Sequence, residues 1–264
     1  MGKVGWIDSH AHLAYQEYDQ DLSNIIANAK ERNVARVLIV TLSDDETRKA
    51  LALNEQYGMF DVAYGVHPSD VDKIPENGFE MLEEFLKKKQ LKAIGEIGLD
   101  YYWHKDNKEE QKSVFIKQIE LANEYEVPII VHMRDSAQDT LDILKKHRPI
   151  KGGIMHCYSG SVEMAFEYIK CGMYISLGGP VTFKNAHTPK EVAKAVGVEW
   201  LLTETDCPYL TPHPFRGKRN EPAMVELVGL QIAQLRGIEP DDFMERVSEN
   251  YNRLFDQSCE SYVK

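Results

Sequence analysis

The stretch IDSHAHL, residues 7–13, places an aspartate and two histidines at alternate positions directly after an apolar run. Alternate side chains of a β-strand point to the same face, so a strand here would direct Asp8, His10 and His12 toward one side of a sheet. Imidazoles and carboxylates are side chains that bind divalent metal ions. If this run is a strand, other strands are expected to bring further ligands to meet these three.

Apolar, β-branched runs recur along the chain and alternate with amphipathic segments. Eight runs predict strands, at Val4–Asp8, Arg36–Thr41, Asp61–Val66, Lys92–Glu96, Ile129–His132, Gly153–His156, Met173–Ser176 and Trp200–Thr205. The segments between them carry apolar residues at three- and four-residue spacing, as in Asp19–Arg32, Asp45–Tyr57, Asn107–Tyr125 and Val162–Lys170.

Strict alternation of strand and helix predicts parallel strand pairing. Eight such units in about 250 residues are the size of a TIM barrel, and a doubly wound open sheet is the alternative. Two helical segments follow the last strand: Ala223–Leu235 closes the eighth unit, and Asp241–Phe255 is an added C-terminal helix. The prediction is therefore an α/β fold, one (β/α)8 barrel domain over residues 1–264.

Composition narrows the class of protein. The 264 residues are 43% hydrophobic, which supports a sizeable core, and no window of about 18 apolar residues predicts a membrane span. The formal net charge of -11 argues against broad binding of nucleic acid through a basic surface, but it leaves room for a phosphate held in a local positive site. Four cysteines without a CxxC pair favour reduced thiols and a cytoplasmic location.

Barrel enzymes build their sites where the strands end, and five predicted strands end in metal-ligating groups. These groups are His10, His12, Glu96, His132, His156 and Asp206. Six ligands exceed what one tetrahedral catalytic ion uses, so they predict two divalent ions bridged by Glu96. Nitrogen and oxygen ligands without thiolate suit Zn, Mn or Co and permit Mg. Asp8 and Glu204 lie one layer below and are expected to accept the second ring N–H of a histidine.

The last loops suggest the substrate. Arg216, Lys218 and Arg219 follow the eighth strand, where barrels often bind phosphate, although a solvated basic turn would give the same pattern. Arg134 and His67 end two other strands and are expected to contact substrate, with metal ligation as the alternative for His67. The run Tyr101–Trp103 after the fourth strand predicts either base stacking or the packing of a lid. Cys157 and Cys207 neighbour predicted ligands, but strand alternation turns them away from the site.

Several motifs in one order resemble a known family. The motifs IDSHAHL, GVHP, GEIGLDYY, VHMRD, MHCYSG, ETDCPYLTP and RGKRNEP are similar to those of the TatD-type metal-dependent deoxyribonucleases, which belong to the wider amidohydrolase barrels. The resemblance implies a two-metal TIM barrel whose ligands fall on the same six residues. It also implies hydrolysis of DNA phosphodiesters, commonly from strand ends, with DNA or another phosphorylated substrate bound transiently.

The expected mechanism is attack by a water that two metal ions activate, with Glu96 and Asp206 as the catalytic carboxylates. A second hypothesis keeps the metals and changes the bond to an ester, amide or lactone, such as an aminoacyl ester on RNA. A third hypothesis is a binding protein that uses the barrel as a platform, and the complete ligand set speaks against it.

Overall fold

The computed structural model describes residues 4–74 and 78–255, and within them eight parallel strands pair in consecutive order. The strands are β1 (Trp6–Ala11), β2 (Val34–Thr41), β3 (Phe60–Tyr64), β4 (Ala93–Asp100), β5 (Ile129–Arg134), β6 (Gly153–Met155), β7 (Met173–Leu177) and β8 (Leu201–Thr203). A doubly wound sheet would reverse its strand order at an interior point, and this sheet does not. The predicted TIM barrel is confirmed.

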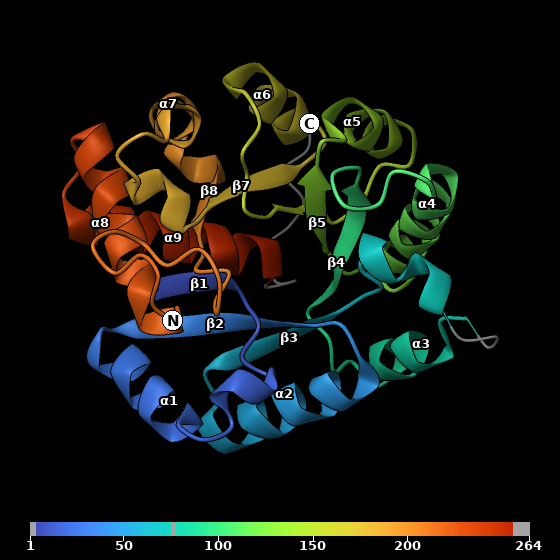
Figure 1. Ribbon diagram of the computed structural model, residues 1–264, viewed down its shortest axis with the longest axis horizontal. Helices are drawn as coiled ribbons and strands as arrows, with labels where there is room; N and C mark the ends of the chain where they lie inside the picture. The colour runs from blue at the N-terminus through green and yellow to red at the C-terminus, as the bar shows by residue number, and fades with distance from the viewer. Residues whose placement is uncertain (1–3, 75–77, 256–264) are drawn as a thin grey trace.

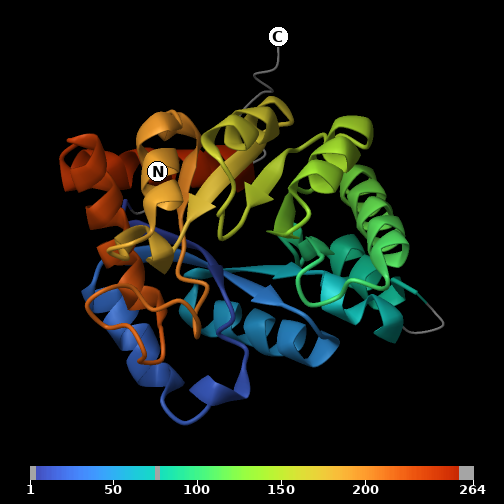
Figure 2. The ribbon, with the colours of Figure 1, turned by 45° about the horizontal axis from the view of Figure 1, so that its top comes forward.

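Helices surround the sheet on its outer side (Figure 1, Figure 2). The α-helices are α1 (Leu22–Glu31), α2 (Asp44–Tyr57), α3 (Glu80–Lys87), α4 (Lys108–Glu124), α5 (Ala137–Lys146), α6 (Val162–Lys170), α7 (His187–Ala195), α8 (Val225–Arg236) and α9 (Pro240–Phe255). Helix α9 is the predicted addition. None of the helices described here is long and apolar enough to cross a membrane.

Two strands extend past their predicted ends. Strand β1 continues to Ala11, so His10 lies inside the strand and is fully buried. Strand β4 runs four residues beyond Glu96 because Gly98 adopts a φ of 138° and lies against the backbone of β5, where a Cβ would approach the carbonyl oxygen of His132 to 2.1 Å. The extension brings Asp100 level with Arg134 on β5.

The barrel closes between β8 and β1 through a seam built mainly by individual hydrogen bonds. The backbone contributes Asp206 N–H to the His10 carbonyl and His12 N–H to the Cys207 carbonyl, both at 2.9 Å. The Thr203 hydroxyl donates to the Ile7 carbonyl at 2.6 Å. We call these contacts, with the Asp8–Thr205 pair described below, the β8–β1 seam. It fixes the predicted ligands of β1 and of the segment after β8 relative to each other.

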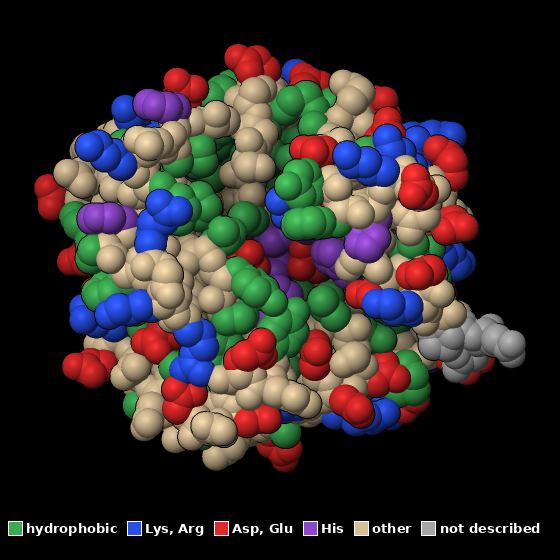
Figure 3. Space-filling view, in the orientation of Figure 1, with side chains coloured by type: hydrophobic (Ala, Val, Ile, Leu, Met, Phe, Trp, Pro, Cys, Tyr) green, Lys and Arg blue, Asp and Glu red, His purple; other side chains and the backbone are tan. Residues whose placement is uncertain are grey.

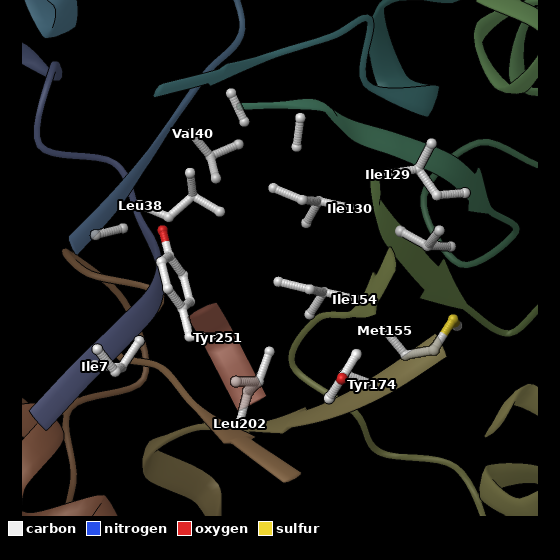
Figure 4. Packing of buried hydrophobic residues seen from close by; sticks show 14 of the residues in the cluster. Ile7, Leu38, Val40, Ile129, Ile130, Ile154, Met155, Tyr174, Leu202 and Tyr251 are labelled. Carbon is white, nitrogen blue, oxygen red and sulfur yellow. The ribbon is translucent and has the colours of Figure 1, made fainter. Parts of the chain in front are cut away.

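Apolar side chains fill the barrel below the level of the predicted ligands. Figure 4 shows Leu38, Ile130 and Ile154 pointing into the interior, with the ring of Tyr251 beside them. The Tyr251 hydroxyl, from α9, donates to Asp61 Oδ2 at 2.9 Å near the start of β3. Helix α9 also packs against β1 and β8, so it lies at the end of the barrel opposite to the strand ends that carry the ligands.

Candidate metal centre

One group of candidate ligand atoms combines the two segments joined by the seam with Glu96 from β4. His10 Nε2 and His12 Nε2 lie 3.2 Å apart, which confirms that the two rings share a face. Asp206 Oδ1 is 3.7 Å from His10 Nε2 and 3.6 Å from His12 Nε2. Glu96 Oε2 approaches His10 Nε2 to 3.4 Å. Two imidazole nitrogens and two carboxylate oxygens therefore face a common point.

A second group lies on the other side of Glu96. Its Oε1 atom is 2.6 Å from His132 Nδ1 and 2.7 Å from His156 Nε2. The His67 ring adds Nε2 at 3.6 Å from the same oxygen. The two oxygens of Glu96 thus face different groups of histidines, which is the arrangement that a bridging carboxylate requires.

The donor set fits divalent cations. Among the described residues, three groups each bring their ligand atoms within 4.8 Å of one another: His10–Glu96–His156, His10–His12–Asp206 and His67–Glu96–His132. Each combines imidazole nitrogen with carboxylate oxygen and lacks thiolate, which suits Zn, Mn or Co. His67 was predicted to contact substrate, and the structure places it where it could equally ligate.

Electrostatics in the cluster follow from burial and mutual contact. Burial raises the pKa of Glu96, but the surrounding histidines together outweigh burial and hold that pKa well below the usual range, through the charges of His156 and His67 and the contacts with His10 and His132. Burial lowers the pKa of His156, and Glu96 and Glu204 more than compensate, so its pKa lies well above normal. Burial also raises the pKa of Asp206, but the hydrogen bond with His12 and the charges of His156, His10 and His12 together lower it below its usual value. The carboxylates are therefore anionic near neutral pH, as metal ligands must be.

The two carboxylates predicted to support histidine rings behave differently. Glu204 Oε1 lies 3.5 Å from His156 Nδ1 and accepts the backbone N–H of Cys157 at 2.6 Å, so it does face a ligand ring. Asp8 does not meet a ring: it accepts Thr205 N–H at 2.9 Å and the Thr205 hydroxyl at 2.6 Å. The ring prediction for Asp8 is wrong because the segment after β8 presents Thr205 to it across the seam. Burial raises the pKa of Asp8 to about 8.

The carboxylate that supports His132 is Asp100, which the sequence analysis did not include among the site residues. Asp100 Oδ2 lies 3.1 Å from His132 Nε2, so His132 sits between two carboxylates, with Glu96 on its Nδ1. A signal was present in the motif GEIGLD: Asp100 stands four residues after Glu96, and even spacing along a strand keeps two side chains on one face. Ending the predicted strand at Glu96 hid that relation.

The cluster lies at the floor of a cavity of about 790 Å³. In Figure 3 the histidine and acidic side chains appear in a central hollow that hydrophobic side chains surround. The cavity is lined by the predicted ligands His12, Glu96, His132, His156 and Asp206 and by His67, Arg134, Trp103 and Tyr209, among others. Cys157 also lines it, contrary to expectation, because a φ of 45° ends the strand alternation at that residue.

The cations predicted to bind phosphate separate into two sets. Arg134 lines the cavity, whereas its described lining does not include Arg216, Lys218 or Arg219. Arg219 donates to Asp21 Oδ2 and to the Glu17 carbonyl, each at 2.5 Å. Arg216 lies over the ring of Phe183 and Lys218 over that of Phe215. These cations therefore contact Asp21, Phe183 and Phe215 instead of lining the cavity, whereas the alternative interpretation predicts a solvated basic turn.

Comparison of the chain with known proteins gives a consistent result. The family described as TatD-related DNase matches residues 7–256. The uncharacterized metal-dependent hydrolase YabD of Bacillus subtilis is 46% identical over 249 residues, which are 94% of this chain and 98% of that protein. The uncharacterized metal-dependent hydrolase YcfH of Escherichia coli is 36% identical over 255 residues, which cover 94% of this chain and 95% of that protein.

Solved structures agree with the sequence matches. The crystal structure of YjjV, a TatD homologue from Escherichia coli, superposes with a TM-score of 0.90 at 28% identity and covers 95% of this chain and 98% of that one. A TatD-family hydrolase from Entamoeba histolytica superposes at 0.84 with 23% identity, covering 98% and 100%, and shows the same fold.

Proposed function

This chain belongs to the family of TatD-related DNases and is a metal-dependent hydrolase, and from that premise we propose that it cleaves DNA phosphodiester bonds, working inward from strand ends. The observation that carries the proposal is the position of Glu96, whose two oxygens face separate groups of histidines at the floor of an open cavity. DNA or another phosphorylated substrate would bind transiently there, in the cytoplasm.

The residues divide into two ligand sets that share one carboxylate. His10, His12 and Asp206 would hold one ion with Glu96, and His132 and His156 would hold a second ion with the same Glu96. Divalent ions at such a site lower the pKa of water and offset charge on the phosphoryl oxygens.

The chain's own groups then have distinct tasks. Asp206 has a side chain that is 14% exposed and a lowered pKa, so its carboxylate is both reachable and ionised to accept the proton of the attacking water. Arg134 and His67 face the cavity and would position the phosphate. Glu204 orients His156 from beneath.

The test uses end-labelled DNA with purified protein supplied with Mn, Zn, Co or Mg in turn. Replacing Glu96 by Gln or Asp206 by Asn is expected to lower turnover by at least about 10²-fold, since general-base catalysis alone contributes that much. The folded structure, followed by circular dichroism, should be retained. Asp142→Asn, an exposed carboxylate on α5, is the matched control. Wild-type nuclease rates in metal-loaded Asp206→Asn would contradict the assignment.

Hydrolysis of an ester, amide or lactone, such as an aminoacyl ester on RNA, is the second candidate. It is favoured by the position of Arg216, Lys218 and Arg219, whose side chains pack within the final loops and leave the cavity with fewer cations for phosphate. A panel of aminoacyl esters and lactones, assayed beside the DNA, decides between the two. Higher kcat/KM on the panel than on DNA would select this second function.

A further inference from the structure

Two exposed aromatic side chains stand at the mouth of the metal cavity, directly after β4. Trp103 lines the cavity and is 66% exposed, and Tyr102 is 46% exposed. Their rings meet edge to face at 4.6 Å. Tyr101, by contrast, is buried, and its hydroxyl donates to Asp139. Large apolar rings left this open next to a catalytic cavity are costly to hydrate unless a ligand covers them.

The aromatic pair is held in register with the metal ligands. Asp100 Oδ1 accepts the backbone N–H groups of both Tyr102 and Trp103 at 2.9 Å. The other oxygen of the same carboxylate lies 3.1 Å from His132 Nε2. One buried carboxylate therefore contacts both the backbone that carries the rings and a candidate ligand of the cluster. A lid that packs loosely over the barrel would have no need of that connection.

A guanidinium completes the surface. Arg134 lies over the ring of Tyr102 at 4.2 Å and 5.5 Å from that of Trp103. It lines the same cavity as His132. The surface thus offers a flat π-face and a positive charge side by side, and guanidinium groups pair with phosphate oxygens while stacking on rings.

We propose that Trp103, Tyr102 and Arg134 form a nucleobase subsite, in which the base next to the scissile phosphate leaves its stack and lies on the indole. This inference rests on the proposed function and narrows it: the substrate is nucleic acid with an unpaired, unstacked base at its end. A nucleotide presents a planar π-system beside an anion, which matches the ring face and the guanidinium. Simple esters and lactones lack that pair of features.

The experiment compares single-stranded hexathymidylate with a hexamer of the same backbone that carries abasic residues at its first two and last two positions. Hydrolysis is measured as kcat/KM with each metal. Binding is measured with EDTA present, by competition against fluorescein-labelled hexathymidylate. Stacking on an aromatic side chain predicts a wild-type preference for the natural hexamer of roughly 5- to 150-fold in both measurements.

Trp103→Ala is expected to lose most of this preference, and Trp103→Phe to keep most of it. Phe166→Ala on α6 removes an aromatic ring that is 42% exposed but outside the described cavity lining, and it is the matched control. A wild-type protein without the preference, or a folded Trp103→Ala that keeps it in full, would overturn the subsite. Preferential binding of hexathymidylate without hydrolysis under any metal would support the subsite and reject the nuclease function. Hydrolysis of both hexamers without preference would support the nuclease function and reject the subsite.

Discussion

His132 is held by a carboxylate on each ring nitrogen. Glu96 Oε1 lies 2.6 Å from its Nδ1 and Asp100 Oδ2 lies 3.1 Å from its Nε2. Burial raises the pKa of Asp100, but contact with His132 and two backbone N–H groups lower it to about 2. An ionised Asp100 that accepts Nε2–H leaves Nδ1 free to face the metal site. Such outer carboxylates fix the tautomer and orientation of a ligating histidine.

Asp100→Asn is expected to weaken metal binding by about 10- to 100-fold. The single carbonyl oxygen of the amide can serve either His132 or the backbone N–H groups of Tyr102 and Trp103, but not both. Isothermal titration with Mn or Zn measures the affinity directly and does not depend on turnover. Asp142→Asn is again the control, and an unchanged Kd in Asp100→Asn would refute the positioning role.

At the scale of elements, the end of β4 is tied to the two helices that flank it. Asp139 on α5 accepts the Tyr101 hydroxyl at 2.7 Å and lies 2.8 Å from Lys112 Nζ on α4. The contact with Lys112, followed by that with Tyr101, lowers the pKa of Asp139. This polar link supports the turn that carries the proposed nucleobase subsite.

The link predicts a pH dependence of stability. The folded pKa of Asp139 lies below its unfolded value of about 3.9. The carboxylate therefore stabilises the fold at pH values above about 3.9, and this stabilisation is lost as pH falls through the folded pKa. Asp139→Asn should therefore lower the Tm at pH 7, and the difference from wild type should shrink at pH 3. Thermal unfolding at the two pH values checks it. A constant difference would show that the charge is not responsible.

Over the whole molecule, the β8–β1 seam joins the two ends of the sheet and half of the metal centre at once. Asp8 is fully buried and takes two hydrogen bonds from Thr205, one to each carboxylate oxygen. His10 follows Asp8 by two residues, and Asp206 comes directly after Thr205. Closing the barrel and bringing the candidate ligands His10, His12 and Asp206 together are therefore one structural event.

Thr205→Val is expected to destabilise the fold by about 1–3 kcal/mol, since a buried carboxyl oxygen loses its donor. Thr205→Ser keeps the hydroxyl, so its free energy of unfolding should lie much closer to that of the wild type. Denaturant unfolding gives both free energies. Equal stability of the Val variant and wild type would mean that the Asp8–Thr205 pair does not hold the seam.

The sequence by itself determined the barrel and the residues that gather at its rim. Alternation along a strand is local, so the shared face of His10 and His12 followed from two-residue spacing, and strand ends carried Glu96, His132, His156 and Asp206 to one place. Strand alternation did not predict the role of Asp100. It lies beyond Gly98, whose effect on the length of β4 depends on its contact with β5.

Tertiary structure alone decided which groups pair across distant segments. Arg219 binds Asp21 and Asp8 binds Thr205, nearly 200 positions away in each case, and no periodicity encodes such a partner. The final loop has no repeating pattern, so its cations were expected at the cavity and are found packed on Phe183, Phe215 and Asp21. Side-chain direction along a strand is set by neighbouring peptide units, whereas contacts between loops are set only once the barrel closes.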